Sequence, residues 1–253
     1  MTSIRVTTYT LALLVAASTV AEARTIQWKG FTWDVNSGSP MGSHGPGQIR
    51  GSASNVVIDA HGYLHMKISG AGSTATGAEF NCTKKTGFGS YYYVLDGPIT
   101  DMERGVVASV FIYGPALRVG GDGEDEIDIE FSKWNGVAGD INADFTFYPN
   151  TGFGKLGSSY GKNFLIDLHG SKVNTCRIDW TSTTITASIW TGVVASTAST
   201  RSAVRTYTYH GDGRTIPQSR CPMMFNLWTF GSLPSRPLDV TVRDYKFIPA
   251  KSQ

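Results

Sequence analysis

Short apolar runs, broken by glycine, asparagine, aspartate and proline, recur along the whole chain. They are rich in valine, isoleucine, threonine and aromatic residues, which favour strands. No window of about 12 residues keeps the apolar repeat of an amphipathic helix. The pattern therefore predicts an all-β protein. Its predicted strands are residues 55–59, 63–68, 90–95, 106–113, 126–131, 141–148, 176–180, 184–190, 223–228 and 240–249.

The connections between these runs predict antiparallel pairing. The sequence Asp59-Ala-His-Gly separates the first two runs, and glycine tolerates the positive φ that a hairpin turn needs. Many antiparallel strands bury their apolar faces by packing as two sheets. We expect an antiparallel two-sheet sandwich in which one outer face is free to carry a concave groove. Residues 195–203, rich in serine, threonine and alanine, should form a long loop or an edge hairpin.

The first 23 residues differ in pattern from the rest. Arg5 carries a positive charge, residues 11–17 are apolar, and small residues follow up to Ala23. This order is typical of a secretory signal peptide that is cleaved after Ala23. The alternative is an N-terminal membrane anchor, but a spanning helix needs roughly 20 apolar residues. We therefore expect a secreted, extracellular protein that does not bind membranes and whose residues 24–253 form a single domain.

The net charge and the cysteines bear on nucleic-acid binding, zinc binding and disulfide formation. The chain carries a net charge of +2, which gives no indication of nucleic-acid binding. Its three cysteines, Cys82, Cys176 and Cys221, have no zinc-binding spacing. One disulfide with one spare thiol is the usual arrangement in an exported chain, and we expect the pair Cys176–Cys221, because both lie near strand-like runs in the same half of the chain. Three buried thiols are the alternative.

The clearest chemical feature is the segment 125–131, Asp-Glu-Ile-Asp-Ile-Glu-Phe, which alternates acidic and apolar residues. Alternation puts Glu126, Asp128 and Glu130 on one face of a strand and the isoleucines and phenylalanine in the core behind it. The Cα atoms of Glu126 and Glu130 are then about 13 Å apart. On a concave sheet, their long side chains can approach the carboxyl separation of about 5–5.5 Å that a retaining glycosidase needs.

Three carboxyl groups on one face raise one another's pKa, so one of them should keep a proton near neutral pH. Double displacement at a glycosidic carbon requires this combination of an ionised nucleophile and a protonated acid. The alternative is an acidic stripe that only faces solvent. Three aligned acidic side chains without a basic residue between them repel one another, so this arrangement is unfavourable unless the function of the protein requires it.

Glu126-Ile-Asp-Ile-Glu130 resembles the E-x-D-x-E signature of glycoside hydrolase family 16. In the same order as in that family, Gly87-Phe-Gly-Ser-Tyr91 resembles its Y-G-x-Y strand, and residues 223–228, Met-Met-Phe-Asn-Leu-Trp, resemble its M-N-L-W segment. The resemblance covers most of residues 24–253 and implies a concanavalin A-like jelly roll. It also implies that Glu126 is the nucleophile, Asp128 the assisting carboxylate and Glu130 the acid/base.

The resemblance places Asn226 and Trp228 along the substrate groove, where an indole offers a flat apolar surface to a sugar ring. We take Trp134 and Asp144 as further candidate substrate-binding residues. Trp228 and Trp134 could instead be core aromatics. Cys176 stands where the family often has histidine, and Glu124 and Asp125 replace the aromatic residue that lichenases have before the motif.

Most laminarinases of the family have the longer motif E-x-D-x-x-E, with one extra residue before the second glutamate. The shorter E-x-D-x-E motif of this chain favours the lichenase and transglycosylase branches. The predicted function is a monomeric, secreted, retaining endo-β-glucanase that hydrolyses or transglycosylates β-1,3/1,4-linked polysaccharides without a cofactor. The acidic, glycine-rich loop 120–125 could hold a structural calcium. The alternative from another class is a non-catalytic, lectin-like sandwich, because one fold hosts many functions. A G-x-S-x-G match at 157–161 is set aside, because no buried strand precedes it and no helical repeat follows.

Overall fold

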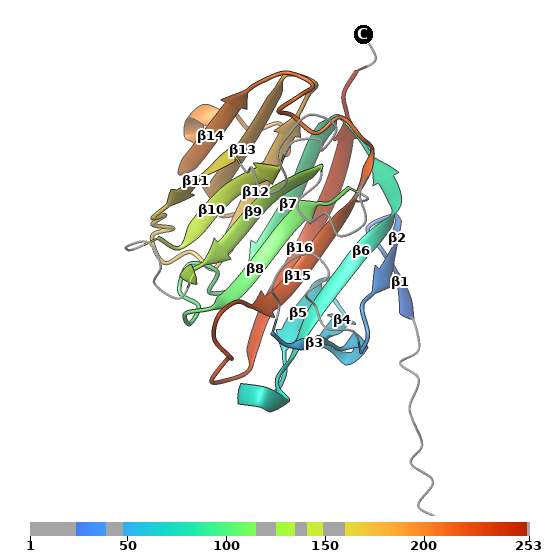
Figure 1. Ribbon diagram of the computed structural model, residues 1–253, viewed down its shortest axis with the longest axis vertical. Helices are drawn as coiled ribbons and strands as arrows, with labels where there is room; N and C mark the ends of the chain where they lie inside the picture. The colour runs from blue at the N-terminus through green and yellow to red at the C-terminus, as the bar shows by residue number, and fades with distance from the viewer. Residues whose placement is uncertain (1–23, 39–47, 115–124, 135–140, 149–159, 252–253) are drawn as a thin grey trace, which may run out of the picture.

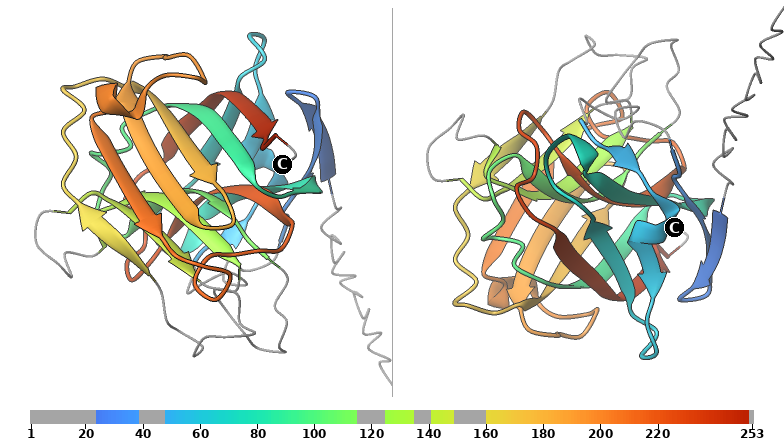
Figure 2. Two further views of the ribbon diagram at one scale, coloured as in Figure 1. Left: turned by 90° about the horizontal axis from the view of Figure 1, so that it is seen from above. Right: turned by 90° about the horizontal axis from the view of Figure 1, so that it is seen from below.

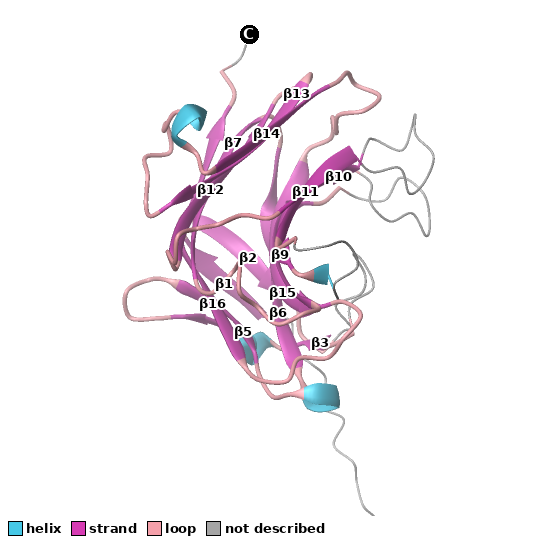
Figure 3. Cartoon of the chain, turned by 90° about the vertical axis from the view of Figure 1, so that its left-hand side faces the viewer, coloured by secondary structure: helices cyan, strands magenta, loops and turns pink. Residues whose placement is uncertain are grey.

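Two β-sheets packed face to face make up the protein (Figure 1, Figure 3). The computed structural model describes residues 24–38, 48–114, 125–134, 141–148 and 160–251. In the described residues, the first sheet has the order β1 (Arg24–Trp28), β2 (Phe31–Val35), β6 (Thr76–Thr86), β15 (Cys221–Thr229), β8 (Val106–Ile112), β9 (Glu126–Ser132), β10 (Ala143–Tyr148) and β11 (Tyr160–Phe164). A short strand, β3 (Arg50–Gly51), joins β6 in parallel, and every other pairing in this sheet is antiparallel.

The second sheet is antiparallel throughout its described strands. Its order is β14 (Arg205–His210), β13 (Thr184–Thr191), β12 (Val173–Trp180), β7 (Gly89–Asp96), β16 (Leu238–Pro249), β5 (Leu64–Ile68) and β4 (Val56–Ile58). Single 3₁₀ turns, η2 (Ala53–Asn55), η3 (Gly72–Thr74) and η5 (Thr200–Ser202), lie in the connections. The predicted antiparallel two-sheet sandwich is confirmed.

Each of the ten predicted runs contains a strand, and the predicted hairpin after Ile58 is present. β4 pairs with β5, Gly62 has φ +77°, and the Asp59 carboxylate accepts hydrogen bonds from the backbone N–H groups of His61 and Tyr63 at 2.9 and 2.8 Å. Residues 195–203 form a loop, ending with η5, between β13 and β14.

The core lies between the sheets and is rich in aromatic side chains. Trp33, Phe80 and Phe225 are fully buried at its centre, with the rings of Phe80 and Phe225 stacked at 4.9 Å. Tyr245 of β16 meets Trp33 from the opposite sheet at 5.3 Å. This packing fixes one sheet rigidly behind the other, so the outer face of the first sheet can serve as a stable platform.

The predicted Cys176–Cys221 disulfide is wrong. Cys82, Cys176 and Cys221 are all free and buried, as in the alternative considered from the sequence. Cys176 lies in β12 and Cys221 begins β15, so they belong to opposite sheets. Packed sheets are about 10 Å apart, whereas bridged cysteines need Cα atoms roughly 4.4–6.8 Å apart. Burial raises the pKa of Cys221 to about 12 and that of Cys176 further, which keeps both as neutral thiols.

The β1–β2 hairpin and strand β16, which come from opposite ends of the sequence, pack against one another (Figure 2). Lys29, at the turn between β1 and β2, forms an ion pair of 3.2 Å with Asp244 of β16. The predicted signal peptide, residues 1–23, lies outside the described residues. Within the residues that are described, no helix has the length and apolar character needed to span a membrane.

Candidate active site

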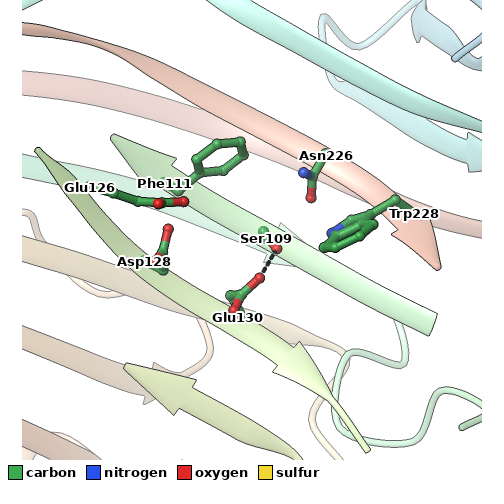
Figure 4. Close-up of a pocket in the computed structure, with 7 residues that line it drawn as sticks. All are labelled: Ser109, Phe111, Glu126, Asp128, Glu130, Asn226 and Trp228. Atoms are coloured by element: carbon green, nitrogen blue, oxygen red, sulfur yellow. Dashed lines mark hydrogen bonds between the residues drawn. The ribbon is translucent and has the colours of Figure 1, made fainter. Parts of the chain in front are cut away.

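Strand β9 sorts its side chains as its sequence alternation predicts. Ile127, Ile129 and Phe131 are at most 1% exposed and belong to the core between the sheets. Glu126 and Asp128 are on the opposite face, where they line a pocket on the outer surface of the first sheet together with Glu130 (Figure 4). The three predicted carboxylates are therefore together, on the face that the fold leaves for a groove.

Neighbouring strands place further side chains level with these carboxylates. Ser109 of β8 and Asp144 of β10 flank Glu130 directly, and Asn226 of β15 is the next residue beyond Ser109. Phe111 of β8 lies level with Asp128 in the same way. The pocket is lined by Ser109, Phe111, Glu126, Asp128, Glu130, Asn226 and Trp228.

Burial and mutual repulsion raise the pKa values of carboxyl groups on this face. Burial, then the charges of Glu126, Glu130 and Asp144, raises the pKa of Asp128 well above its ordinary value. The raised pKa favours the acid form of Asp128 beside the Glu126 carboxyl group. Figure 4 shows the Asp128 carboxyl group directed toward Glu126.

Glu130 also has a pKa well above its ordinary value, caused first by burial and then by the charge of Asp144. The Ser109 hydroxyl donates a hydrogen bond of 2.7 Å to Oε1 of Glu130 and opposes this rise, because it stabilises the ionised form. A raised pKa favours the acid form of Glu130, and the Ser109 hydrogen bond holds its carboxyl group in a fixed position.

Trp228 lines the pocket, and Trp134 belongs to the hydrophobic cluster around it. They pack with Val107 and Phe230, and the Trp134 and Phe230 rings meet edge to face at 5.5 Å. Within the described residues, the indole N–H groups of Trp228 and Trp134 and the Oδ1 atom of Asn226 are buried without a hydrogen-bond partner. Buried polar atoms of this kind are usually satisfied, so a polar ligand in the groove is an expected partner for them.

A family model described as glycosyl hydrolases family 16 matches residues 47–243. The chain belongs to glycoside hydrolase family 16. A comparison with curated protein sequences gives no significant match.

Several solved structures share the family 16 fold with this chain. A β-glucanase of Bacillus licheniformis is similar with a TM-score of 0.61 and 20% identity, over 87% of this chain and 92% of that one. A Bacteroides ovatus family 16 protein in complex with a mixed-linkage glucan product has a TM-score of 0.62 and 14% identity, over 85% and 94% of the two chains. An immunostimulatory antigen of Mycobacterium tuberculosis, described as a pseudo β-1,3-glucanase, has a TM-score of 0.61 and 17% identity, over 87% and 91%.

Some residues of this family 16 site were missed by sequence reasoning. Ser109 and Phe111 line the pocket, and Glu79 of β6 lies level with Asn226 on the same face, where it accepts a hydrogen bond of 2.9 Å from the Asn36 amide. Ser109 could have been found, because it is a polar residue inside an otherwise apolar strand. Glu79 had no such signal, since its strand is largely polar.

The candidate calcium site from the sequence is the loop 120–125. All of it except Asp125 lies outside the described residues. Among the residues that the structure does describe, no three histidine, cysteine, aspartate or glutamate side chains are grouped to hold a metal ion.

Proposed function

We propose that this family 16 protein is a secreted, retaining endo-β-glucanase that acts on β-1,3/1,4-linked glucans. The observation that carries the proposal is the alignment of Glu126, Asp128 and Glu130 on one buried pocket face, with the pKa values of Asp128 and Glu130 raised. A retaining mechanism needs one carboxylate that attacks and one carboxyl group that first donates and then accepts a proton.

In the first step, Glu130 donates its proton to the glycosidic oxygen while a Glu126 oxygen attacks the anomeric carbon. The bond to the leaving sugar breaks and a glycosyl ester on Glu126 forms. In the second step, Glu130 takes a proton from water, whose oxygen attacks the anomeric carbon and releases Glu126. A sugar hydroxyl in place of water gives transglycosylation.

Asp128 supports Glu126 in both steps. Its acid form lies beside the Glu126 carboxyl group, and it stabilises the carboxylate that leaves when the ester is broken. In this proposed mechanism, protonated Asp128 acts on the nucleophile Glu126, and protonated Glu130 acts on the leaving group.

The groove supports a polysaccharide as the ligand. The Trp228 and Trp134 rings offer apolar faces for sugar rings, and the unpartnered Asn226 Oδ1 atom can accept a hydrogen bond from a sugar hydroxyl. The similar structures described as β-glucanases and as a mixed-linkage glucan complex favour a β-glucan. Secretion follows from the proposed signal peptide, with Arg24 as the first residue of the mature chain.

The test is the Glu126→Gln variant on a panel of β-glucans. Loss of the nucleophile should reduce the rate by several orders of magnitude and leave oligosaccharide binding nearly unchanged. The first product of the wild-type protein should be the β-anomer by proton NMR. Glu103→Gln, the same change at a carboxylate outside the pocket, should retain activity.

The pseudo-glucanase description of a similar structure identifies the competing outcome, a sandwich that binds glycans without cleaving them. A wild-type protein that binds β-glucan but turns over none would support that outcome. An α-anomer as first product would contradict the retaining mechanism.

A further inference from the structure

A fourth carboxyl group, that of Asp144, faces the three carboxylates of β9. Asp144 is directly opposite Glu130 in the antiparallel β9–β10 pair and is 5% exposed. Side chains opposite one another on one face of such a pair have Cβ atoms about 4.5–5.5 Å apart. The negative charge of Asp144 raises the pKa of Glu130, and among the causes of that rise only burial is larger.

The surroundings of Asp144 favour the ionised form on this side of the pair. The Thr146 hydroxyl donates a hydrogen bond of 3.3 Å to Oδ1 of Asp144. The Trp134 indole N–H is close enough to lower the pKa of Asp144, although it lies outside good hydrogen-bond geometry. Burial opposes both effects, and the result is a pKa of about 6. Asp144 is therefore largely ionised at neutral pH, and its charge opposes loss of the proton from Glu130.

Among the described residues, the charged groups considered around the pair lie on the neighbouring strands β9 and β11. From β9, Glu126 and Asp128 face the same pocket as Glu130. From β11, Lys162 is level with Phe145, a core residue, so Lys162 is on the opposite face of the sheet, where its ammonium group lies 5.9 Å from the Phe164 ring. Among the described residues, no cation forms an ion pair with Asp144. Within the part of the chain that the structure describes, no ion pair neutralises the negative charge with which Asp144 acts on Glu130.

We propose that Asp144 is a positioning residue whose negative charge, directly opposite Glu130, keeps Glu130 in its acid form. This inference rests on the proposed function of Glu130 as acid/base, and it assigns Asp144 a different role from the substrate binding expected from the sequence. Asp144 acts in both steps. Before the first step, its charge holds the proton on Glu130. After Glu130 has given that proton to the leaving sugar, two carboxylates face each other, and their repulsion strengthens Glu130 as the base that takes a proton from water.

Asp144→Asn tests this role, because it keeps the size of the side chain and removes its charge. The alkaline limb of the kcat/KM pH profile reports loss of the proton from the acid. It should move to lower pH by about one unit in Asp144→Asn. Asp144→Glu, which keeps the charge, should restore part of the shift. Asn163→Ala, on the other side of Asp144 in β11, should leave the limb in place.

A substrate-binding role would give a different result. KM would rise in Asp144→Asn while the alkaline limb stayed in place, and this result would overturn the proposal.

A measurement without turnover separates this proposal from the proposed function. Carbon NMR of ¹³C-carboxyl-labelled protein gives the titration of Glu130 and Asp144 directly. We expect Glu130 in the wild type to titrate well above Asp144, and its midpoint to fall in Asp144→Asn. If the wild type cleaves no β-glucan, the proposed function fails, but the titration still decides the pairing. If Asp144→Asn does not fold, the wild-type titration alone is decisive: ordinary midpoints for both groups would overturn the proposal.

Discussion

The carboxyl groups of the pocket differ in their neighbours, and these neighbours decide which group holds a proton. Glu130 has a hydroxyl donor on one side, from Ser109, and a carboxylate on the other, from Asp144. The first stabilises the ionised form of Glu130 and the second stabilises its acid form. The pKa of the proposed acid is thus balanced between two residues that lie on different strands and that can be changed one at a time.

Ser109→Ala should move the alkaline limb of the kcat/KM profile to higher pH. Removing the hydroxyl donor raises the pKa of Glu130, so the acid form persists further into the alkaline range. The direction is opposite to that expected for Asp144→Asn, and the same pH series measures both. Ser188→Ala, a buried serine in the opposite sheet, is the control and should shift neither limb. A downward shift in Ser109→Ala would contradict this account.

Glu130→Gln should distinguish substrates by their leaving groups. General acid catalysis contributes roughly 10²–10⁴-fold in rate, so hydrolysis of β-glucan should fall by about that factor. An activated aryl β-glycoside, whose departure needs little protonation, should still release its phenol at a rate much closer to that of the wild type. The release is followed spectrophotometrically. Equal losses on both substrates would show that Glu130 is not the acid.

The residues of the pocket were partly predictable from the sequence. The alternation of acidic and apolar residues was enough to group Glu126, Asp128 and Glu130, because a strand has a strict period of two. The pairing of Asp144 with Glu130 was not predictable, since it depends on the register between β9 and β10, which no local pattern specifies. The same holds for the cysteines, whose separation depends on which sheet each strand joins.

At the scale of the elements, the ten predicted runs contain strands, but β1, β2, β3, β6, β11 and β14 were not predicted, although β2 has an alternating apolar face. β6 alternates buried Ala78, Phe80 and Cys82 with polar residues, but lysines and threonines occupy its second half. β14 has an exposed residue at every second position and only partly buried tyrosines between them. Edge and groove strands obtain much of their stabilisation from pairing, which local sequence does not show.

One glycine of the family-like segment 87–91 has a structural explanation. Gly89 begins β7, between β12 and β16, with φ +155°. A Cβ there would lie 2.8 Å from Cε2 of Phe247 and 3.0 Å from Cα of Pro249, and it would also clash with the Ile248 carbonyl oxygen. The glycine allows β7 and β16 to approach closely at this point, which is behind the pocket rather than in it.

Gly89→Ala should destabilise the fold by about 1–3 kcal/mol, as overpacking in a rigid interior does. Gly87→Ala is a matched control, because its Cβ would meet only the flexible Arg220 side chain, with Cγ at 3.3 Å. Urea unfolding followed by tryptophan fluorescence gives both midpoints. Equal midpoints for the two variants would contradict the proposed close approach at Gly89.

At the scale of the whole molecule, one sheet serves as a support for the other. The aromatic layer formed by Trp33, Phe80 and Phe225 holds the first sheet in place, so that its outer face can carry four carboxyl groups at close range. Such a cluster is unfavourable for folding, because burial and mutual repulsion both disfavour its ionised forms. The stability of the fold should therefore depend on pH in a way that reflects the pocket.

The pKa values of Asp128, Glu130 and Asp144 are raised in the folded protein, so the folded state binds more protons than the unfolded state above about pH 4. The contribution of these groups to stability is fully present at pH values below their pKa values in the unfolded chain. It is lost as the pH rises through their pKa values in the folded protein, which for Asp144 is about 6. Each unit of pKa difference corresponds to about 1.4 kcal/mol.

Glu130→Gln replaces one of these groups by an uncharged one. Its free energy of unfolding should match the wild type at pH 4 and exceed it increasingly toward pH 8. Urea unfolding at one-unit pH steps measures the difference, and Glu103→Gln should show no such trend. A difference that is constant with pH, or largest at pH 4, would contradict a buried and protonated Glu130.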